Sequence, residues 1–296
     1  MKRVLVTGAS GFIGRHCLPL LVERGYEIHA VSRTPPTVAC ARWHQVNLLA
    51  DAPEPLLRDI RPTHLLHLAW TAVPGKFWTD PDNARWLKAS LALARAFAEA
   101  GGRRLVCAGS CAEYDWNAGQ CIEDRTALAP TTPYASAKHE LHAALTTLAA
   151  QPGISLAWAR VFWLFGPHEH PQRLVPSAVL AMKAGKPFSC LTPELVRDFL
   201  HVEDVASGFV ALLESDQGGA VNVASGQGTS IGAIVSQISA LLHTQDLVRM
   251  GAGPARGDAP TVVGDSKRLR ATGWKPRHDL ASGLADTVHW WQSVPA

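Results

Sequence analysis

The chain opens on Val4-Leu5-Val6-Thr7-Gly8-Ala9-Ser10-Gly11-Phe12-Ile13-Gly14, a short apolar run followed by three spaced glycines. The run predicts a buried strand, and the residues after Gly11 predict the start of an amphipathic helix. In such a turn, Gly8 allows the tight bend, Gly11 lets the backbone approach a pyrophosphate, and Gly14 lets the helix pack closely on the strand. The pyrophosphate would rest on the unpaired amides of the helix start. The stretch predicts a dinucleotide-binding unit, and an ordinary strand-to-helix turn is the alternative.

Beyond this unit, apolar runs alternate with helical patterns through the first two thirds of the chain. Buried parallel strands are predicted at 3–7, 27–32, 64–69, 104–109 and 156–163. Helices are predicted between them at 12–24, 52–60, 84–100 and 134–150. This order predicts an α/β fold with a doubly wound, Rossmann-type parallel sheet.

The alternation loosens after Gly166, where Pro and Gly become denser. Later segments, including 230–242, are expected to form a smaller C-terminal substrate-binding lobe over the carboxyl ends of the strands, where ligands of such sheets bind. The predicted dinucleotide-binding domain is therefore 1–165, to which the chain returns at 196–225. The predicted lobe is 166–195 and 226–296.

The bulk composition excludes several classes of protein. The 296 residues are 47% hydrophobic and 18% charged, which indicates a globular protein without extensive disorder, and a net charge of +3 is too mild to predict nucleic-acid binding. The most apolar stretch, 154–165, is too short for a bilayer and carries Arg160, so no membrane association is expected. The six cysteines lack C-x-x-C or metal-ligand spacing, which predicts free thiols in a reducing cytosol. The N-terminus has no basic-then-apolar leader, and a cytoplasmic location is predicted.

A second motif, Pro133-Tyr134-Ala135-Ser136-Ala137-Lys138, places a tyrosine and a lysine four residues apart in a predicted helix. Such positions share one helix face, so the ammonium is expected beside the phenol. A nearby cation favours the phenolate and would lower the tyrosine pKa from about 10 toward neutrality. Such a tyrosine exchanges a proton with an alcohol or ketone oxygen near pH 7. Alone, the pair is also typical of a solvated helix face, but with the glycine turn it predicts an oxidoreductase.

A hydroxyl follows the predicted strand 104–109, in Ala108-Gly109-Ser110-Cys111-Ala112-Glu113-Tyr114, 24 residues before Tyr134. With this segment the chain resembles the extended short-chain dehydrogenase/reductases (the NAD-dependent epimerase/dehydratase family), and among them the enzymes that act on nucleotide-diphosphate sugars. The resemblance covers nearly the whole chain. It is carried by Thr7 to Gly14, His67-Leu68-Ala69, the Ser110 segment, Tyr134 to Lys138, Gly166-Pro167-His168, Arg197-Asp198-Phe199-Leu200-His201-Val202 with Asp204, Arg256-Gly257-Asp258 and Gly273-Trp274-Lys275-Pro276.

The resemblance implies a role for each matching residue. Tyr134 would be the general acid in reduction, Lys138 would lower its pKa and bind the nicotinamide ribose, and Ser110 would orient the substrate carbonyl. For Ser110 the alternative is a hydroxyl that caps a strand end. The implied cofactor-binding residues are Gly8, Ser10, Gly11, Phe12, Ile13, Gly14, Arg33, Leu48, Leu68, Ala69, Ala108, Tyr134 and Lys138. The implied substrate-binding residues are Trp70, Ser110, Cys111, Trp163, His168, Arg173, Arg197 and Arg256, and no metal site is implied.

Two of these arginines, Arg197 and Arg256, resemble residues that clamp a substrate diphosphate, a task that suits the guanidinium fork. Surface ion pairing is the alternative. Arg173 would approach a phosphate or a base. The loop His168-Glu169-His170 contains possible metal ligands, but Pro167 and Pro171 make it irregular and no further ligand cluster is evident, so a metal is not expected there.

The choice of cofactor depends on Val31-Ser32-Arg33-Thr34, after the second predicted strand. An NAD enzyme usually has an acidic residue there for the ribose hydroxyls, whereas an arginine accommodates the 2′-phosphate of NADP. Arg33 therefore predicts NADP(H), with NAD(H) as the alternative.

Departures from the family narrow the reaction. The 4,6-dehydratases have a catalytic glutamate where this chain has Ala112, and Glu113 is one position away, so dehydration is disfavoured. The 3,5-epimerase/reductases have a cysteine at the Ala112 position, and Cys111 is out of register, so that activity is also disfavoured. The Ser-Tyr-Lys set remains, and it suffices for 4-keto reduction or for 4-epimerisation. Trp70 and Trp163 would form an apolar wall that suits a 6-deoxy sugar, with core packing as the alternative.

The sequence therefore predicts NADPH-dependent reduction of a nucleotide-diphosphate 4-keto-6-deoxy sugar. The alternatives are a nucleotide-sugar 4-epimerase with tightly bound NAD and a non-catalytic NAD(P)-binding sensor. The predicted helices 84–100 and 134–150 are rich in Ala and Leu, so a homodimer that pairs them is expected, with burial inside one subunit as the alternative.

Overall fold

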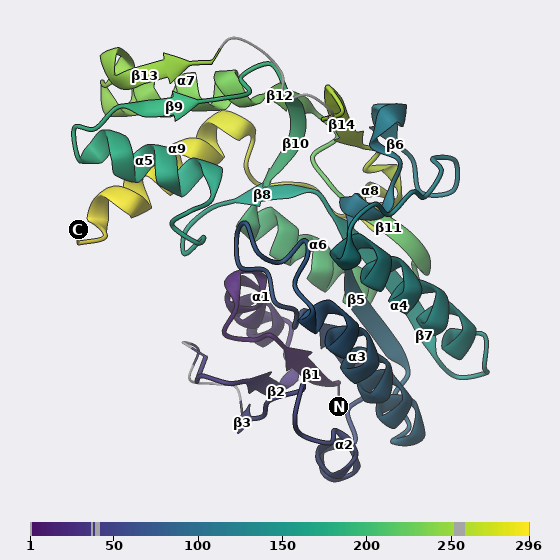
Figure 1. Cartoon of the computed structure of the whole chain (residues 1–296). Helices are drawn as coiled ribbons and strands as arrows, with labels where there is room; N and C mark the ends of the chain where they lie inside the picture. The colour runs from purple at the N-terminus through teal and green to yellow at the C-terminus, as the bar shows by residue number, and fades with distance from the viewer. Residues whose placement is uncertain (1, 37, 39–41, 252–257, 296) are drawn as a thin grey trace.

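The computed structural model describes residues 2–36, 38, 42–251 and 258–295. Its largest element is a seven-stranded sheet with the strand order β11-β7-β5-β4-β1-β2-β3 (Figure 1). Every neighbouring pair in this sheet runs parallel. The strands are β1 (Arg3–Thr7), β2 (Glu27–Ser32), β3 (Arg42–Gln45), β4 (His64–His67), β5 (Arg104–Ser110), β7 (Ser155–Val161) and β11 (Gly219–Val223).

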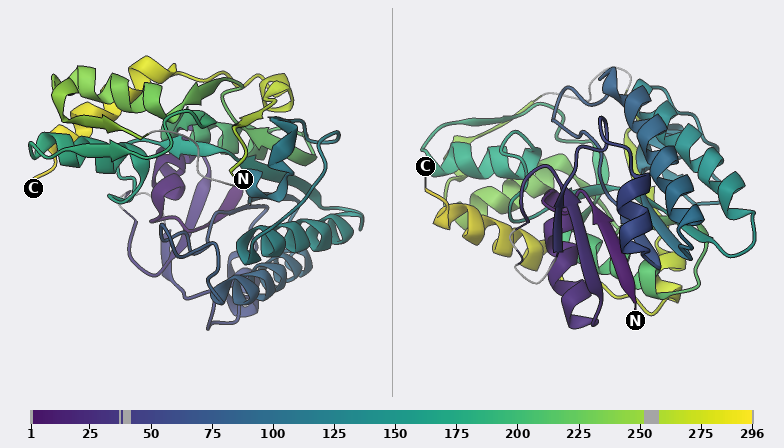
Figure 2. Two further views of the ribbon diagram at one scale, coloured as in Figure 1. Left: turned by 45° about the horizontal axis from the view of Figure 1, so that its top comes forward. Right: turned by 90° about the horizontal axis from the view of Figure 1, so that it is seen from below.

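Helices cover both faces of this sheet, as Figure 2 shows. Successive side chains of a strand point to opposite faces, so Val4 and Val6 of β1 pack with one set of helices and Leu5 with the other. The first set is α1 (Phe12–Glu23) and α6 (Val202–Glu214), and the second is α2 (Glu54–Ile60), α3 (Asp82–Glu99) and α4 (Pro133–Ala149). Because both faces are buried, the central strands β1, β4, β5 and β7 are mostly apolar, which is why the sequence pattern could predict them.

The order of the strands reverses at β1. The chain runs from β1 to β2 and β3 on one side, and then returns to β4, β5, β7 and β11 on the other. This is the doubly wound arrangement, so the predicted α/β fold with a parallel Rossmann-type sheet is confirmed. In such sheets the carboxyl ends of the two strands beside the reversal open a crevice for ligands.

A smaller group of elements lies above the large sheet in Figure 1. A second sheet has the order β12-β10-β14-β6, and β8 pairs with β10. Three helices share a core of their own beside a two-stranded sheet of β9 and β13. The elements are β6 (Gln120–Cys121), β8 (Trp163–Phe165), α5 (Leu174–Lys183), β9 (Phe188–Cys190), β10 (Val196–His201), β12 (Gly228–Ser230), α7 (Ile231–Leu242), β13 (Val248–Met250), β14 (Thr261–Gly264) and α9 (Leu280–Ser293). The short helix α8 (Lys267–Ala271) instead packs Leu269 into the core of the large sheet.

The predicted elements are present, with two informative differences. The expected strand 64–69 ends at His67, because the N–H groups of Leu68 and Ala69 donate to the Thr7 hydroxyl. The expected strand 156–163 is two strands, β7 in the large sheet and β8 in the small one. β3 and β11 were not predicted. The division into domains at residue 165 stays a prediction.

Two findings concern the bulk predictions. No helix within the described ranges is both long enough and apolar enough to cross a bilayer. The five cysteines in those ranges, Cys17, Cys107, Cys111, Cys121 and Cys190, are free, as predicted, and they are also buried; Cys40 lies outside those ranges.

Candidate active site

The glycine turn joins β1 to α1 at the point where the strand order reverses. Gly8 has φ +68°, a conformation that other residues rarely adopt, and the N–H of Gly11 donates to its carbonyl oxygen at 2.9 Å. A Cβ on Gly14 would lie 2.2 Å from that oxygen, and one on Gly8 would lie 2.9 Å from the Ala69 nitrogen. The helix start at Gly11 has no side-chain cap. Its amides are therefore available to an anion, and the turn fits a dinucleotide pyrophosphate.

The segment after β2 lies against this turn. The Thr34 hydroxyl donates to Ser10 Oγ at 3.1 Å, and the neighbouring Arg33 is exposed. The Ser32 hydroxyl donates to the Thr34 carbonyl at 2.6 Å. An arginine, rather than a carboxylate, thus stands beside the predicted cofactor turn.

The three predicted catalytic side chains meet beyond the end of β5. Helix α4 begins at Pro133, and its cap Thr132 accepts from the Ala135 amide at 3.2 Å, which sets Tyr134 in the first turn. The Ser110 hydroxyl lies near the Tyr134 phenol and acts to lower the tyrosine pKa. The Lys138 ammonium is 3% exposed and donates to the Ala108 carbonyl at 2.9 Å. The pair is therefore not on a solvated helix face.

The predicted effect of Lys138 on Tyr134 is wrong. Burial raises the pKa of Tyr134 above its ordinary value, and the nearby Ser110 hydroxyl only partly opposes this. The Lys138 nitrogen lies 5.9 Å from the centre of the phenol ring, and burial lowers its own pKa to about 8. Desolvation is therefore the largest influence on the Tyr134 pKa, and the cation that opposes it is Arg173 rather than Lys138.

Aromatic rings enclose Tyr134 and Lys138. The rings of Trp70, Phe77 and Trp78 meet the Tyr134 ring edge-on, with centroid separations of 6.2, 4.9 and 5.7 Å. The Lys138 nitrogen lies 3.8 Å from the centre of the Trp70 indole, close enough for a cation–π contact. Trp70 is itself held by a hydrogen bond from its indole N–H to Asn83, at 2.9 Å. Phe77 and Trp78 were not predicted, because they lie in an irregular loop without a recognisable spacing.

A buried ion pair holds the Ser110 segment from behind. The Glu113 carboxylate is fully buried and accepts from Arg160 Nε at 3.0 Å, from Trp158 Nε1 at 3.0 Å and from the Ser110 N–H at 2.8 Å. Ser110 also caps the short helical turn that follows it, and its role toward the substrate carbonyl stays a prediction. The Glu113 side chain faces the interior and is used by these partners. Its position therefore agrees with the prediction that Glu113 does not act as the catalytic carboxylate of a dehydratase.

The predicted substrate residues fall into two groups. Arg197 is buried, with its guanidinium carbon 5.2 Å from the Trp163 ring centre and 5.9 Å from that of Trp116. Cys111 lies close by, since its carbonyl accepts from the Trp116 indole at 2.8 Å. Arg173 lies on the other side, 5.3 Å from the Phe77 ring centre. Trp116 was missed, since nothing in its local sequence distinguishes it from a core residue.

Two predicted residues, His168 and Leu48, stand apart from these groups. His168 is exposed, and its ring lies 4.4 Å from that of Trp290 and 6.1 Å from that of His16, on the side of α1 and α9. Leu48 is half-buried and packs against the core under α2 and α3. Arg256 lies outside the described residues.

Comparison with known proteins agrees with the geometry. The profile of the NAD dependent epimerase/dehydratase family matches residues 4–224. The chain is 29% identical over 314 residues to the GDP-6-deoxy-D-mannose reductase of Pseudomonas aeruginosa, covering 99% of this chain and 98% of that protein. It is 26% identical to the UDP-glucose 4-epimerase of Azospirillum brasilense, covering 98% and 92%. The structure of Thermus thermophilus UDP-glucose 4-epimerase in complex with NAD is similar with a TM-score of 0.86 and 26% identity, over 99% of this chain and 100% of that one.

Proposed function

Because the chain belongs to the NAD dependent epimerase/dehydratase family, we propose that it reduces the 4-keto group of a nucleotide-diphosphate 4-keto-6-deoxy sugar with NADPH. The chain is an oxidoreductase-type enzyme, whose relatives include nucleotide-sugar reductases and epimerases. The observation that carries the proposal is the meeting of Ser110, Tyr134 and Lys138 beside the glycine turn, with Arg33 after β2.

Each part of the site has a role in this reaction. The turn from Gly8 to Gly14 would hold the pyrophosphate of NADPH, and Arg33 its 2′-phosphate. The bound cofactor supplies a hydride to the keto carbon. Tyr134 gives its proton to the oxygen that gains negative charge, while Ser110 hydrogen-bonds that oxygen. Lys138 would bind the nicotinamide ribose, and Arg197 would anchor the diphosphate between Trp116 and Trp163.

One feature favours reduction over 4-epimerisation. A reductase exchanges cofactor with the cellular NADPH pool, and Arg33 suits the 2′-phosphate. The epimerase relatives make a 4-epimerase with bound NAD the second candidate.

The direct test is the loss of NADPH absorbance with a panel of GDP-, dTDP- and CDP-4-keto-6-deoxy sugars. Oxidation with one of them is expected, and GDP comes first because of the similarity to a GDP-6-deoxy-D-mannose reductase. No oxidation with any of them, together with NAD released on denaturation and interconversion of UDP-glucose and UDP-galactose, would establish the epimerase instead. If neither assay detects activity, the non-catalytic NAD(P)-binding sensor is the remaining alternative.

Arg33→Ala is expected to weaken NADPH binding about 10- to 100-fold and to change NADH binding less than twofold. The reason is that a charge-assisted hydrogen bond contributes about 1.5–3 kcal/mol, and only NADPH carries the phosphate. Fluorescence titration of both cofactors measures this without turnover, and Arg58→Ala on α2 is the matched control. Wild-type protein that binds NADH tenfold more tightly than NADPH would reverse the assignment.

We also propose a homodimer through α3 and α4. The two helices pack side by side, and a groove between them is lined by Leu91, Arg95, Ala144, Thr147, Leu148 and Gln151. A second copy of the same helix pair could fill that groove in an isologous contact. Sedimentation velocity at micromolar concentration is expected to give a dimer of about 64 kDa, twice the 31.8 kDa chain. A monomer under these conditions would exclude it.

A further inference from the structure

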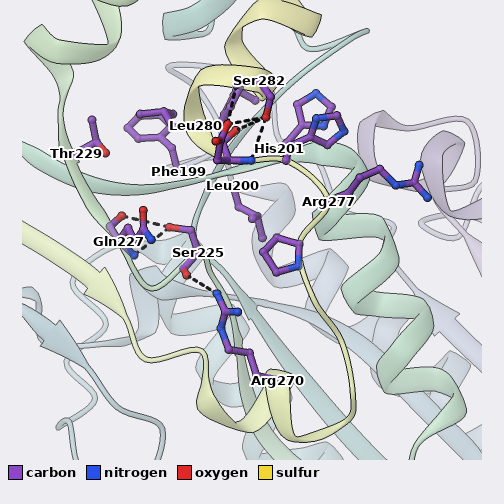
Figure 3. A pocket seen from close by; sticks show the side chains of 14 residues that line it. Phe199, Leu200, His201, Ser225, Gln227, Thr229, Arg270, Arg277, Leu280 and Ser282 are labelled. Atoms are coloured by element: carbon purple, nitrogen blue, oxygen red, sulfur yellow. Dashed lines mark hydrogen bonds between the residues drawn. The ribbon is translucent and has the colours of Figure 1, made fainter.

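Three side chains that can ligate a metal meet where α6 begins. They are His201, Glu203 and His278, and one ligand atom of each lies within 4.8 Å of the others. The closest pair is His278 Nε2 and Glu203 Oε2, at 3.2 Å. His201 and His278 also line a cavity of about 360 Å³ (Figure 3), whose wall includes none of Ser110, Tyr134 and Lys138. Within the described ranges, these three side chains bring their possible ligand atoms together, whereas the 168–170 loop contributes to no such group.

The His201 ring is buried with its polar atoms unsatisfied. Its side chain is 1% exposed, and both Nδ1 and Nε2 lack a hydrogen-bond partner in the part of the chain that the structure describes. A neutral imidazole has one donor and one acceptor, and leaving either buried without a partner is unfavourable. A carboxylate oxygen of Asp286 lies 3.3 Å from Nε2 without forming a hydrogen bond. A cation bound to a ring nitrogen would satisfy that nitrogen.

The backbone that carries these residues is fixed. Asp204, one residue after Glu203, accepts hydrogen bonds from the N–H groups of Arg277 and His278 at 2.6 and 3.0 Å. The indole of Trp274 donates to Ser207 Oγ at 2.9 Å, which ties the same segment to α6 a turn further on. His278 is thus held against the first turn of α6 by groups outside the cluster, so its ligand position does not depend on a flexible loop.

We propose that His201, Glu203 and His278 bind a zinc ion that fastens the segment before α9 to the start of α6. Imidazole nitrogens and carboxylate oxygens are ligands that Zn²⁺ takes at about 2.0–2.2 Å, which places tetrahedral neighbours about 3.3–3.6 Å apart. The hydrogen-bonded pair His278 Nε2 and Glu203 Oε2, 3.2 Å apart, is close to this spacing, and Asp286 Oδ2 lies 3.3 Å from His201 Nε2 at the edge of the cluster. Asp286 is the nearest further ligand.

One cation competes for this site. Arg277 Nη1 lies 4.0 Å from Glu203 Oε2, at the outer limit of an ion pair, and its side chain is 76% exposed. A guanidinium so exposed can leave the carboxylate for water at little cost. None of the three ligands comes from the Ser110 and Tyr134 segments, so the zinc ion has a structural role. Zinc binding is therefore measured by its effect on the melting temperature of the protein.

The experiment uses the untagged full chain, stripped with EDTA and then mixed with one equivalent of ZnCl₂. Zinc is expected to raise the melting temperature by about 5 °C or more in scanning calorimetry, since an ion that binds only the folded chain stabilises it. Mass spectrometry of the dialysed protein is expected to find one zinc per chain. Both His278→Ala and Glu203→Gln should abolish most of the shift, whereas His289→Ala, an exposed histidine on α9, should retain it.

Either of two results overturns the proposal: wild-type protein without a zinc-dependent shift, or His278→Ala with the same shift as wild type. His278 and Glu203 are partly exposed, so both variants should fold, and their metal-free melting temperatures verify this. Co²⁺ provides a second readout, because a tetrahedral site gives it visible absorption bands. Those bands should appear with wild type and be lost in His278→Ala.

Discussion

Tyr134→Phe is expected to lower kcat by about 10²–10⁴-fold while NADPH affinity stays within about twofold of wild type. The variant removes only the hydroxyl that gives its proton to the forming alkoxide. The ring remains, so its edge-on contacts with Trp70, Phe77 and Trp78 are kept and the pocket retains its shape. Stopped-flow turnover with the active keto-sugar and fluorescence titration of NADPH separate the two effects.

The chain offers a matched control for this variant. Tyr26 is buried, and its hydroxyl has no hydrogen-bond partner among the described residues. Tyr26→Phe therefore removes the same atom from a tyrosine outside the predicted active site. Its kcat should equal that of wild type. Unchanged turnover in Tyr134→Phe would exclude the proton-transfer mechanism, whatever the sugar.

Glu113→Ala is expected to lower the free energy of unfolding by about 3–5 kcal/mol. The substitution leaves the Arg160 guanidinium, which is 1% exposed, without its counter-charge. It also leaves the Ser110 N–H and the Trp158 indole N–H without an acceptor. Urea unfolding followed by fluorescence measures the loss, and exposed Glu140→Ala on α4 should stay within about 0.5 kcal/mol of wild type.

Two further variants identify the cause of that loss. Glu113→Gln keeps an acceptor for Ser110 but removes the charge, so it should lie between Glu113→Ala and wild type. Combining Glu113→Gln with Arg160→Met removes both charges and should recover stability relative to Glu113→Ala, since a buried pair is costly mainly when one partner is left alone. A loss below about 1 kcal/mol in Glu113→Ala would show that the pair does not stabilise the fold.

The positions of the predicted site residues in the fold follow from the sequence where the information is local. The turn from Gly8 to Gly14 needs small residues at fixed spacings, because neighbouring backbone atoms occupy the space of a Cβ. Ser110 ends β5 and Tyr134 lies in the first turn of α4. Parallel strands end at one edge of a sheet, so the meeting of these two residues follows from topology. The role of each residue in catalysis remains a proposal.

The prediction failed where a property depends on all neighbours at once. From a spacing of four residues, Lys138 should have lowered the pKa of Tyr134, yet burial raises it. Desolvation depends on the rings of Phe77 and Trp78, which come from a loop more than fifty residues earlier in the chain. No local pattern carries that information.

The sequence alone determined the fold class, the cofactor turn and the elements that carry Ser110, Tyr134 and Lys138, because backbone hydrogen bonding and periodic burial are encoded within each segment. The tertiary structure decided which distant side chains pair, such as Glu113 with Arg160 and His278 with Glu203. It also decided which groups keep their protons. Side-chain pairing and protonation both depend on how the helices and strands pack against one another. Packing sets the distance between two charges and the extent to which each charge is desolvated.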